Sequence, residues 1–458
     1  TQNHTSPLRP GNRTGAYKRV CFIAHALIPE HLSSDLINRR LREIGQAPLE
    51  EGGVGSDGRP GFIKWLDFPV RPKVGQMVRV QFYIIPVYGE DFIPAAFDGR
   101  AYAWSEHVAL QAIHMASLEG CDLTIGWGAA TKIATKHGQV FLDRHPEFAD
   151  KVEFSTTHGD AGTAALALQA VRNAGFKRDF RVAIIGANGA IGDVMSRALA
   201  RNFRPTSITL VGRADKVGET KKRDRLFELK GRVILAQPLG STTEVEVHQD
   251  KSTACVRSGR EVDLVIVATF GMKLEPSEIP AGAVVIDMTA PPACEDDPGW
   301  KHRLVLTAGC GEFDRSSIPR GFGTIGDDRV SDLGMGSGVI WGCTGETIAR
   351  AASADCAGHI VGTKIPLKEV DWSKDAFERI GFHTQPPLMF GKSLSWDQVR
   401  RFVRRAKMTR FQRFTGVLDE VARRAARSNL STCTSQVAHG DFSCRDRTPD
   451  WKSGVFAF

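Results

Sequence analysis

The sequence predicts an α/β protein whose main sheet is parallel and doubly wound. Short apolar runs alternate with helical patterns between residues 162 and 306, as strands and covering helices do in such sheets. A glycine-rich turn at residues 186–192 joins one of these strands to a helix. The 458 residues are also too many for one ordinary core. We therefore expect a Rossmann-type domain, a second α/β domain before it and helices after it.

Residues 20–160 are expected to form the second α/β domain, after a disordered leader at residues 1–19. The leader is polar, is rich in Pro, Gly and Arg, and has no apolar core. In the domain, alternating or clustered apolar residues predict strands, and apolar residues at helical spacing predict helices. The predicted strands are Val20–Ala24, Val78–Ile85 and Leu123–Gly126, and the predicted helices are Glu106–Leu118 and Thr131–Phe141.

Residues 161–338 carry the clearest alternation and are expected to be the Rossmann domain. Helices are predicted at Gly162–Ala174 and Ile191–Asn202. Strands are predicted at Arg181–Ile185, Ser207–Val211, Leu264–Ala268, Val284–Asp287 and Leu304–Leu306. Residues 339–428 are expected to be a helical segment that packs on the 20–160 domain, and residues 429–458 a tail.

The bulk composition excludes several classes of protein. No run of about 18 apolar residues occurs, so we expect no membrane span. The nine cysteines are scattered without zinc-type spacing, which predicts no metal site and reduced thiols in the cytoplasm. The net charge of +8 suits an acidic partner, but no motif for nucleic-acid binding accompanies it. No oligomeric state is predicted.

The glycine-rich turn is the first candidate site. A buried strand, a glycine turn and a helix N-terminus together present backbone amides to the pyrophosphate of a dinucleotide. The spacing here is GxxGxxG, and the alternative is an ordinary strand-to-helix turn. We assign to this site Gly186, Asn188, Gly189, Ala190, Ile191 and Gly192, together with Ala268 at the end of a later strand.

Arg213 follows the second strand of the predicted Rossmann domain. An NAD site usually has an acidic residue here, whereas an arginine suits the 2′-phosphate of NADP. We therefore expect NADPH as the cofactor. Lys216, Lys221 and Lys222 lie nearby and could add charge, but a solvated basic loop is the preferred interpretation for them.

Cys343 stands out in the segment Val339–Ala349. It lies at a predicted helix start, where the helix dipole favours a thiolate, and Glu346 follows three residues later on the same face. A thiolate can take an acyl group from a thioester, and the enzyme-bound thioester can then receive a hydride and collapse to an aldehyde. The alternatives are a buried, inert Cys343 and a Glu346 that caps the helix instead of deprotonating the thiol. Neither a Tyr-x-x-x-Lys pair after the glycine turn nor a zinc-ligand spacing offers another mechanism.

These residues resemble the long-chain acyl-acyl-carrier-protein reductases of the cyanobacterial type. The similarity runs from about Val20 to about Gly362, roughly three quarters of the chain. Its landmarks are Phe22–His25, Ile84–Pro86 through Pro94, Gly126–Gly128, Thr156–Asp160 with Thr163, the glycine turn, Arg213, Val285–Asp287 and Cys343–Glu346. The chain departs from the family at His158–Asp160, in the Gly-rich segment Glu312–Gly338 and beyond Gly362, so we regard it as a divergent member.

The resemblance implies an NADPH-dependent reduction of an acyl thioester to an aldehyde through an acyl group on Cys343. The thioester would come from an acyl carrier protein or from CoA. His25 and His158 are candidate acids or bases, each with a structural role as the alternative. Thr157 and Asp160 are expected beside the nicotinamide or the acyl group.

The basic stretch Ser395–Arg427 could attract an acidic carrier protein or could be a solvated helix face. Its basic residues interleave with Phe402, Phe411 and Phe414. Two other functions stay open. One is a dehydrogenase of the shikimate or amino-acid type that uses no thiol, and the other is a scaffold that binds NADP without catalysis.

Overall fold

The computed structural model describes residues 18–26, 62–213, 220–256, 261–269, 272–289, 292–314, 317, 339–353 and 358–409. The chain forms two units, Thr1–Val403 and Arg404–Phe458, and the named helices and strands belong to the first. The predicted leader, apart from its last two residues, and the tail at 429–458 lie outside the described residues.

The first sheet is built from strands β1 to β5 in the order β2-β3-β1-β4-β5. All neighbours are parallel except β2 and β3, which pair antiparallel. The strands are β1 (Lys18–Ala26), β2 (Ile63–Val70), β3 (Val78–Tyr88), β4 (Leu123–Trp127) and β5 (Phe154–Thr157).

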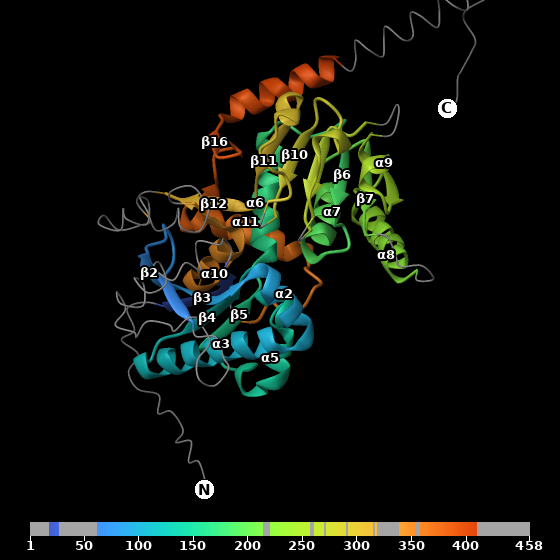
Figure 1. Ribbon diagram of the computed structural model, residues 1–458. Coiled ribbons are helices and arrows are strands. Elements are labelled where there is room, and N and C mark those ends of the chain that lie inside the picture. Colours follow the sequence, from blue (N-terminus) through green and yellow to red (C-terminus); the bar gives the residue numbers. More distant parts are fainter. Residues whose placement is uncertain are drawn as a thin grey trace, which may run out of the picture. The chain divides into compact units, whose positions relative to one another are not determined.

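Two groups of helices cover the two faces of this sheet (Figure 1). Cys21 and Ile23 of β1 pack towards α2 (Gly89–Asp98) and α3 (Arg100–Glu119). Val20 and Phe22 belong instead to the core that includes α6 and α10. Successive side chains of a strand point to opposite faces of the sheet. Alternate residues of β1 therefore contact different groups of helices.

The second sheet has the strand order β8-β7-β6-β9-β10-β11, and these six strands are all parallel. They are β6 (Arg181–Ile185), β7 (Ser207–Val211), β8 (Glu244–His248), β9 (Leu264–Val267), β10 (Val284–Asp287) and β11 (Leu304–Thr307). This is the 3-2-1-4-5-6 order of a Rossmann sheet, which confirms the predicted fold class. β15 (Leu388–Met389) and β16 (Lys392–Ser393) extend its edge antiparallel.

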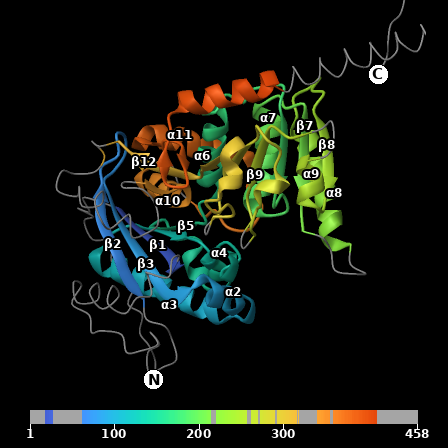
Figure 2. The same cartoon turned by 45° about the horizontal axis from the view of Figure 1, so that its top comes forward.

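Helices lie on both faces of the second sheet (Figure 2). α6 (Asp160–Asn173), α7 (Ala190–Asn202) and α8 (Lys221–Ala236) share a core with one face. α9 (Lys251–Val256) and the short 3₁₀ turns Pro276–Glu278 and Pro298–His302 cover the other. The alanines of α6 let α7, α10 and α11 approach it closely, so this helix is almost entirely buried.

A small antiparallel sheet joins distant segments and was not predicted. It contains β12 (Cys310–Phe313), β13 (Val339–Trp341) and β14 (Phe382–Thr384). α10 (Gly342–Ala352) continues directly from β13, and α11 (Leu367–Ile380) leads into β14. The sheet thereby fixes the start of α10, the helix that carries Cys343.

Other differences from the prediction have local causes. The helix expected at Thr131–Phe141 is two short helices, α4 (Thr131–Ala134) and α5 (Gln139–Arg144). Lys136, His137 and Gly138 between them have φ values of 46°, 57° and 82°, which no right-handed helix accommodates. Residues 396–409 are helical, and the rest of the basic stretch lies outside the described residues. Among the helices described, none is long and apolar enough to cross a membrane.

Candidate active site

Cys343 is the second residue of α10, as predicted for a helix start. The amide of Gly342 donates a 2.7 Å hydrogen bond to the carbonyl of Gly309, two residues after β11 ends. The helix therefore begins at the carboxyl edge of the second sheet. α10 also packs on β1 and β4 of the first sheet, so Cys343 lies where elements of both sheets meet.

Gly159 makes the closest backbone approach to Cys343. Its φ is +68°, and a Cβ atom added to it would stand 2.5 Å from the Cβ atom of Cys343. A Cβ atom on Gly162 would likewise stand 2.6 Å from the carbonyl oxygen of Gly342. Only glycine allows the turn before α6 and the first turn of α6 to lie this close to the start of α10. From sequence alone, Gly159 is notable only as part of the departure from the family pattern at His158–Asp160.

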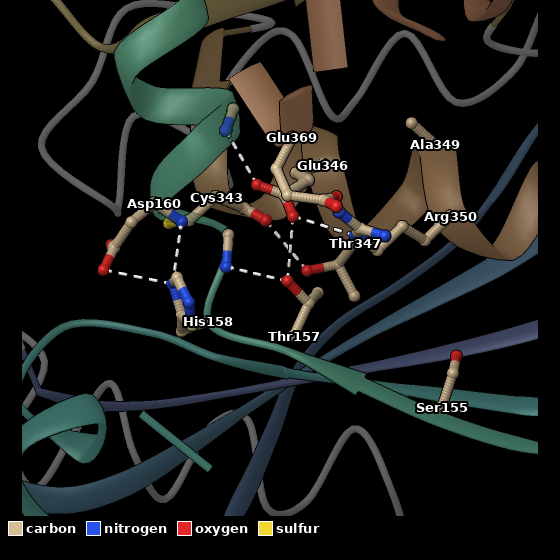
Figure 3. A network of polar contacts seen from close by, with 12 residues as sticks. Ser155, Thr157, His158, Asp160, Cys343, Glu346, Thr347, Ala349, Arg350 and Glu369 are labelled. Carbon is tan, nitrogen blue, oxygen red and sulfur yellow. Dashed lines mark hydrogen bonds and ion pairs between the residues drawn. The ribbon is translucent and has the colours of Figure 1, made fainter. Parts of the chain in front are cut away.

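A buried charged cluster surrounds Asp160, the residue after Gly159. The ammonium of Lys132 on α4 forms an ion pair with one carboxylate oxygen of Asp160. The Nδ1 atoms of His137 and His158 lie 3.2 and 3.1 Å from the other oxygen. The amide of Asp160 also donates to Nδ1 of His158 at 3.2 Å (Figure 3). Asp160 and His158 are each 1% exposed, so the cluster is shielded from water.

Burial and Lys132 act in opposite directions on the acids of this site. Burial alone would raise the pKa of Asp160, but Lys132 and His158 hold that pKa well below its ordinary value. Burial also raises the pKa of the Cys343 thiol, and here the charge of Lys132 offsets only part of the rise. Lys132 keeps its own charge despite burial, because Asp160 and Cys343 raise its pKa.

Glu346 is fully buried and joins three elements through its carboxylate. It accepts hydrogen bonds from Oγ1 of Thr157 at 2.9 Å, from the amide of Gly162 at 2.7 Å and from Nε of Arg350 at 2.8 Å (Figure 3). Arg350 in turn reaches Glu369 of α11 at 2.8 Å. These contacts favour the structural alternative for Glu346, in which it orders the helix, over its role as a base.

The residues predicted for the thiol site do not all lie on the same face of the first sheet. His158, Thr157 and Asp160 lie with Cys343 and Glu346. The expectation that Thr157 and Asp160 lie beside the nicotinamide or the acyl group stays a prediction. His25 points to the same face of β1 as Cys21 and Ile23, the face covered by α2. Its ring stacks on that of Phe92, with the ring centroids 4.8 Å apart. Its Nδ1 donates to the carbonyl of Ala26 at 2.6 Å. His25 thus lies on the other face of the first sheet from α10.

Lys132 and His137 were missed by the sequence analysis. The available signal was a lysine within the apolar run Ala129–Ala134, directly after a strand and a Gly-Trp-Gly turn. Donor atoms of His137, His158 and Asp160 lie within 4.8 Å of one another, a spacing that a metal ion could use. The ammonium of Lys132 already neutralises Asp160, so we interpret the cluster as an ion-pair network and not as a metal site.

The glycine turn lies at the point where the strand order of the second sheet reverses. Gly186 has φ +85°, and a Cβ atom on it would stand 2.7 Å from the carbonyl oxygen of Ala268. The amides of Gly186 and Ala187 donate to the carbonyl of Val211 at 2.9 and 3.0 Å. The turn after β6 therefore lies between the ends of β7 and β9. Dinucleotides bind at such switch points in open α/β sheets.

The start of α7 is open towards this switch point. Gly189 caps the helix without a side-chain hydrogen bond, and the first helical bond is from Asp193 N to Gly189 O at 2.8 Å. The amides of Ala190, Ile191 and Gly192 therefore precede the helical ladder. A Cβ atom on Gly192 would overlap the carbonyl oxygen of Gly186, so the third glycine permits this approach.

Asn188 connects the glycine turn to the segment after β7. Its Nδ2 donates to the carbonyl of Lys222 at 3.0 Å and packs against Gly212, the residue before Arg213. Arg213 is exposed, and its carbonyl accepts from Gln249 at 3.4 Å. Lys221 and Lys222 begin α8, while Lys216 lies outside the described residues. The structure thus brings together the glycine turn, Ala268 and Arg213, as the sequence analysis expected.

No protein-family model and no curated protein matches the chain. Solved structures similar to parts of it include a quinone oxidoreductase from Thermus thermophilus (14% identity, 31% of this chain, 42% of that chain, TM-score 0.22). Another is the iminosuccinate reductase of Paracoccus denitrificans (14% identity, 49% of this chain, 64% of that chain, TM-score 0.24). A third is a protein designated an aspartate carbamoyltransferase from Leishmania major (13% identity, 63% of this chain, 78% of that chain, TM-score 0.28). The chain spans less than two thirds of the first four structures it matches. These structures are too dissimilar to indicate a function, which is inferred from the site itself.

Proposed function

We propose that the protein is an oxidoreductase that binds NADPH and reduces an acyl thioester to an aldehyde through an acyl group on Cys343. The observation that carries this proposal is the hydrogen bond between Gly342 and Gly309. It ties the helix start at Cys343 to the carboxyl edge of the second sheet, the edge on which the glycine turn also lies. A buried thiol and a dinucleotide-type turn therefore share one strand edge.

The residues at the switch point fit a dinucleotide. Gly186 and Gly192 permit the close backbone contacts of the turn, since a Cβ atom on either would meet a backbone carbonyl oxygen, and the first amides of α7 can face a pyrophosphate. Arg213 would hold the 2′-phosphate, which favours NADPH over NADH. When bound, NADPH supplies the hydride.

In the proposed reaction the thiolate of Cys343 attacks the carbonyl carbon of the thioester. The carbon–sulfur bond to the carrier breaks, and the carrier thiol leaves with the proton that Cys343 lost. Hydride addition to the enzyme-bound thioester then gives a thiohemiacetal on Cys343, whose collapse releases the aldehyde and restores the thiol. The balance is one acyl thioester, one NADPH and one proton consumed for one aldehyde, one carrier thiol and one NADP⁺ formed.

The thioester donor in this proposal is an acyl carrier protein or CoA. The proposal follows the resemblance to acyl-acyl-carrier-protein reductases, in which Cys343, Thr344 and Glu346 occupy the motif of the nucleophile. Arg404 and Arg405 are exposed on the helix of residues 396–409 and carry the charge that an acidic carrier protein would meet.

A second candidate is a dehydrogenase that uses no thiol and acts on a ketone or an alcohol. The observation that favours it is the buried ion pair between Lys132 and Asp160, since such a pair can pass a proton to or from a hydroxyl group. In that reaction Cys343 would only fill space.

Intact-mass measurements distinguish these functions. The protein is incubated with acyl-carrier-protein or acyl-CoA thioesters, first without and then with NADPH. We expect an acyl adduct that NADPH clears as aldehyde forms. Cys343→Ala should give no adduct, whereas the control Cys121→Ala, at a half-buried cysteine outside the cluster, should behave as wild type. Full reductase activity in Cys343→Ala would support the dehydrogenase, and NADPH binding without any turnover would support a scaffold.

A further inference from the structure

Three helix starts bring an ammonium, a carboxylate and a thiol to one buried point. Lys132 belongs to the four-residue helix α4, Asp160 is the first residue of α6 and Cys343 is the second residue of α10. Asp160 pairs with Lys132, and its neighbour Gly159 lies against the backbone and Cβ of Cys343. The side chain of Lys132 is 13% exposed, so its charge acts in a largely dry environment.

The fixed charges around Cys343 fall into two pairs. Glu346 is neutralised by Arg350, which lies 2.8 Å away on the same helix. Asp160 is neutralised by Lys132. A thiolate on Cys343 would be a further negative charge in this buried place, and a buried charge is stable only near a compensating one. Lys132 is the cation of these two pairs whose field most lowers the pKa of Cys343.

We propose that Lys132 is a positioning residue that stabilises the thiolate of Cys343, and that Asp160 with His137 and His158 holds the ammonium in place. This inference rests on the proposed function for its purpose, since a thioester is attacked by a thiolate. It assigns a role to four residues of one cluster, of which the sequence analysis had singled out only His158 and Asp160.

The same arrangement explains why Lys132 needs Asp160. Once Cys343 carries an acyl group its negative charge is gone, and a lysine facing only the thiolate would be left buried and unpaired. Asp160 remains as its partner, so Lys132 keeps its charge through the whole cycle. The other titratable groups around the thiol are Asp160 and Glu346, which oppose its ionisation, and the imidazoles of His137 and His158 beside Asp160. The thiol of Cys310 stays neutral, because burial and Cys343 raise its pKa.

The test is the pH dependence of alkylation of Cys343 by iodoacetamide, followed by peptide mass without acyl donor or NADPH. We expect the inflection of this profile to lie about one to three pH units higher in Lys132→Met than in wild type. Lys132→Arg should keep the inflection near that of wild type, because it keeps the charge. The matched control is Lys136→Met, at an exposed lysine on the turn after α4, which should leave the profile unchanged.

Lys132→Met leaves Asp160 buried without its cation, so the double variant Lys132→Met/Asp160→Asn provides a second measurement. It removes both charges, and its inflection should still lie above that of wild type because Lys132 affects Cys343 more than Asp160 does. Unchanged inflections in folded Lys132→Met or in the double variant would overturn the inference. A Lys132-dependent profile in a protein that forms no acyl adduct would leave the inference standing and would contradict the proposed function.

Discussion

Gly159 contacts Cys343 so closely that a Cβ atom on the glycine would stand 2.5 Å from both the Cβ and the carbonyl oxygen of the cysteine. The overlap involves backbone, so no change of rotamer relieves it. We expect Gly159→Ala to lower the free energy of unfolding by about 1–3 kcal/mol through overpacking, in addition to backbone strain. Alkylation of Cys343 should also slow, because the start of α10 must move away. Urea unfolding and the alkylation rate measure the two effects.

Gly120 provides the matched control for Gly159. Its φ is +63°, close to the +68° of Gly159, but no atom lies within 4 Å of an added Cβ. Gly120→Ala should therefore show the backbone strain alone, about 1–2 kcal/mol, with alkylation unchanged. Equal losses of stability in the two variants would show that a Cβ atom at position 159 does not clash with Cys343.

A second prediction concerns the third glycine of the dinucleotide-type turn. A Cβ atom on Gly192 would overlap the carbonyl oxygen of Gly186 and stand 2.8 Å from the Cα atom of Ala187. We expect Gly192→Ala to weaken NADPH binding by about tenfold or more, because the turn loses the shape that faces the pyrophosphate. Fluorescence titration with NADPH measures this change.

Gly231 on α8 is the control for Gly192, since nothing lies within 4 Å of a Cβ atom added there. Gly231→Ala should stabilise the protein by about 0.5–1 kcal/mol through helix propensity and leave NADPH binding as it is. If Gly192→Ala binds NADPH as wild type does, the turn is not the cofactor site.

The prediction for Arg213 separates NADPH from NADH. Loss of a charged hydrogen bond to the 2′-phosphate should weaken NADPH binding roughly tenfold to a hundredfold in Arg213→Ala and leave NADH binding unchanged. Arg178→Ala, at an exposed arginine before β6, is the control for the loss of one positive charge. Equal losses for NADPH and NADH would contradict the assignment of Arg213.

The strands of the second sheet were predictable because each is a short apolar run with clear ends. β6, β7 and β10 have the bounds expected from the sequence. α8 was missed although Leu226, Leu229 and Val233 are spaced as on a helix, because its first lysines were interpreted as a loop. α2 was missed because Pro94 stands inside it.

The chemistry around Cys343 could be predicted only in part. The motif predicted the helix start at Cys343, which the structure confirms, whereas the role of Cys343 as a nucleophile stays a prediction. The pair of Lys132 and Asp160 depends on β4 and β5 being neighbours in register, which apolar periodicity alone does not determine. His25 shows the same limit, since a shift of one residue on β1 would have turned it towards α10. The predicted domain limits at residues 160 and 338 remain predictions.

A further prediction tests whether Glu346 has a structural role, in which it orders α10, or acts as a base. Glu346→Gln keeps the shape of the side chain but removes the charge that pairs with buried Arg350, which should cost about 3 kcal/mol of unfolding free energy. Glu369→Gln, at the less buried partner of Arg350, should cost less. If Glu346→Gln is as stable as wild type but forms no acyl adduct, Glu346 acts as the base and has no structural role.

The final prediction is that the free energy of unfolding falls at acidic pH because Asp160 becomes protonated. Its pKa in the folded protein lies well below the ordinary value, mainly because Lys132 offsets the effect of burial. A lowered folded pKa contributes stability above the unfolded pKa, and this contribution disappears as the pH falls towards the folded pKa. The excess stability of wild type over Asp160→Asn should therefore be constant above about pH 5 and decline below about pH 4. Urea unfolding of both proteins at several acidic pH values measures it, and an excess that persists to about pH 2 would show that Asp160 is not the group responsible.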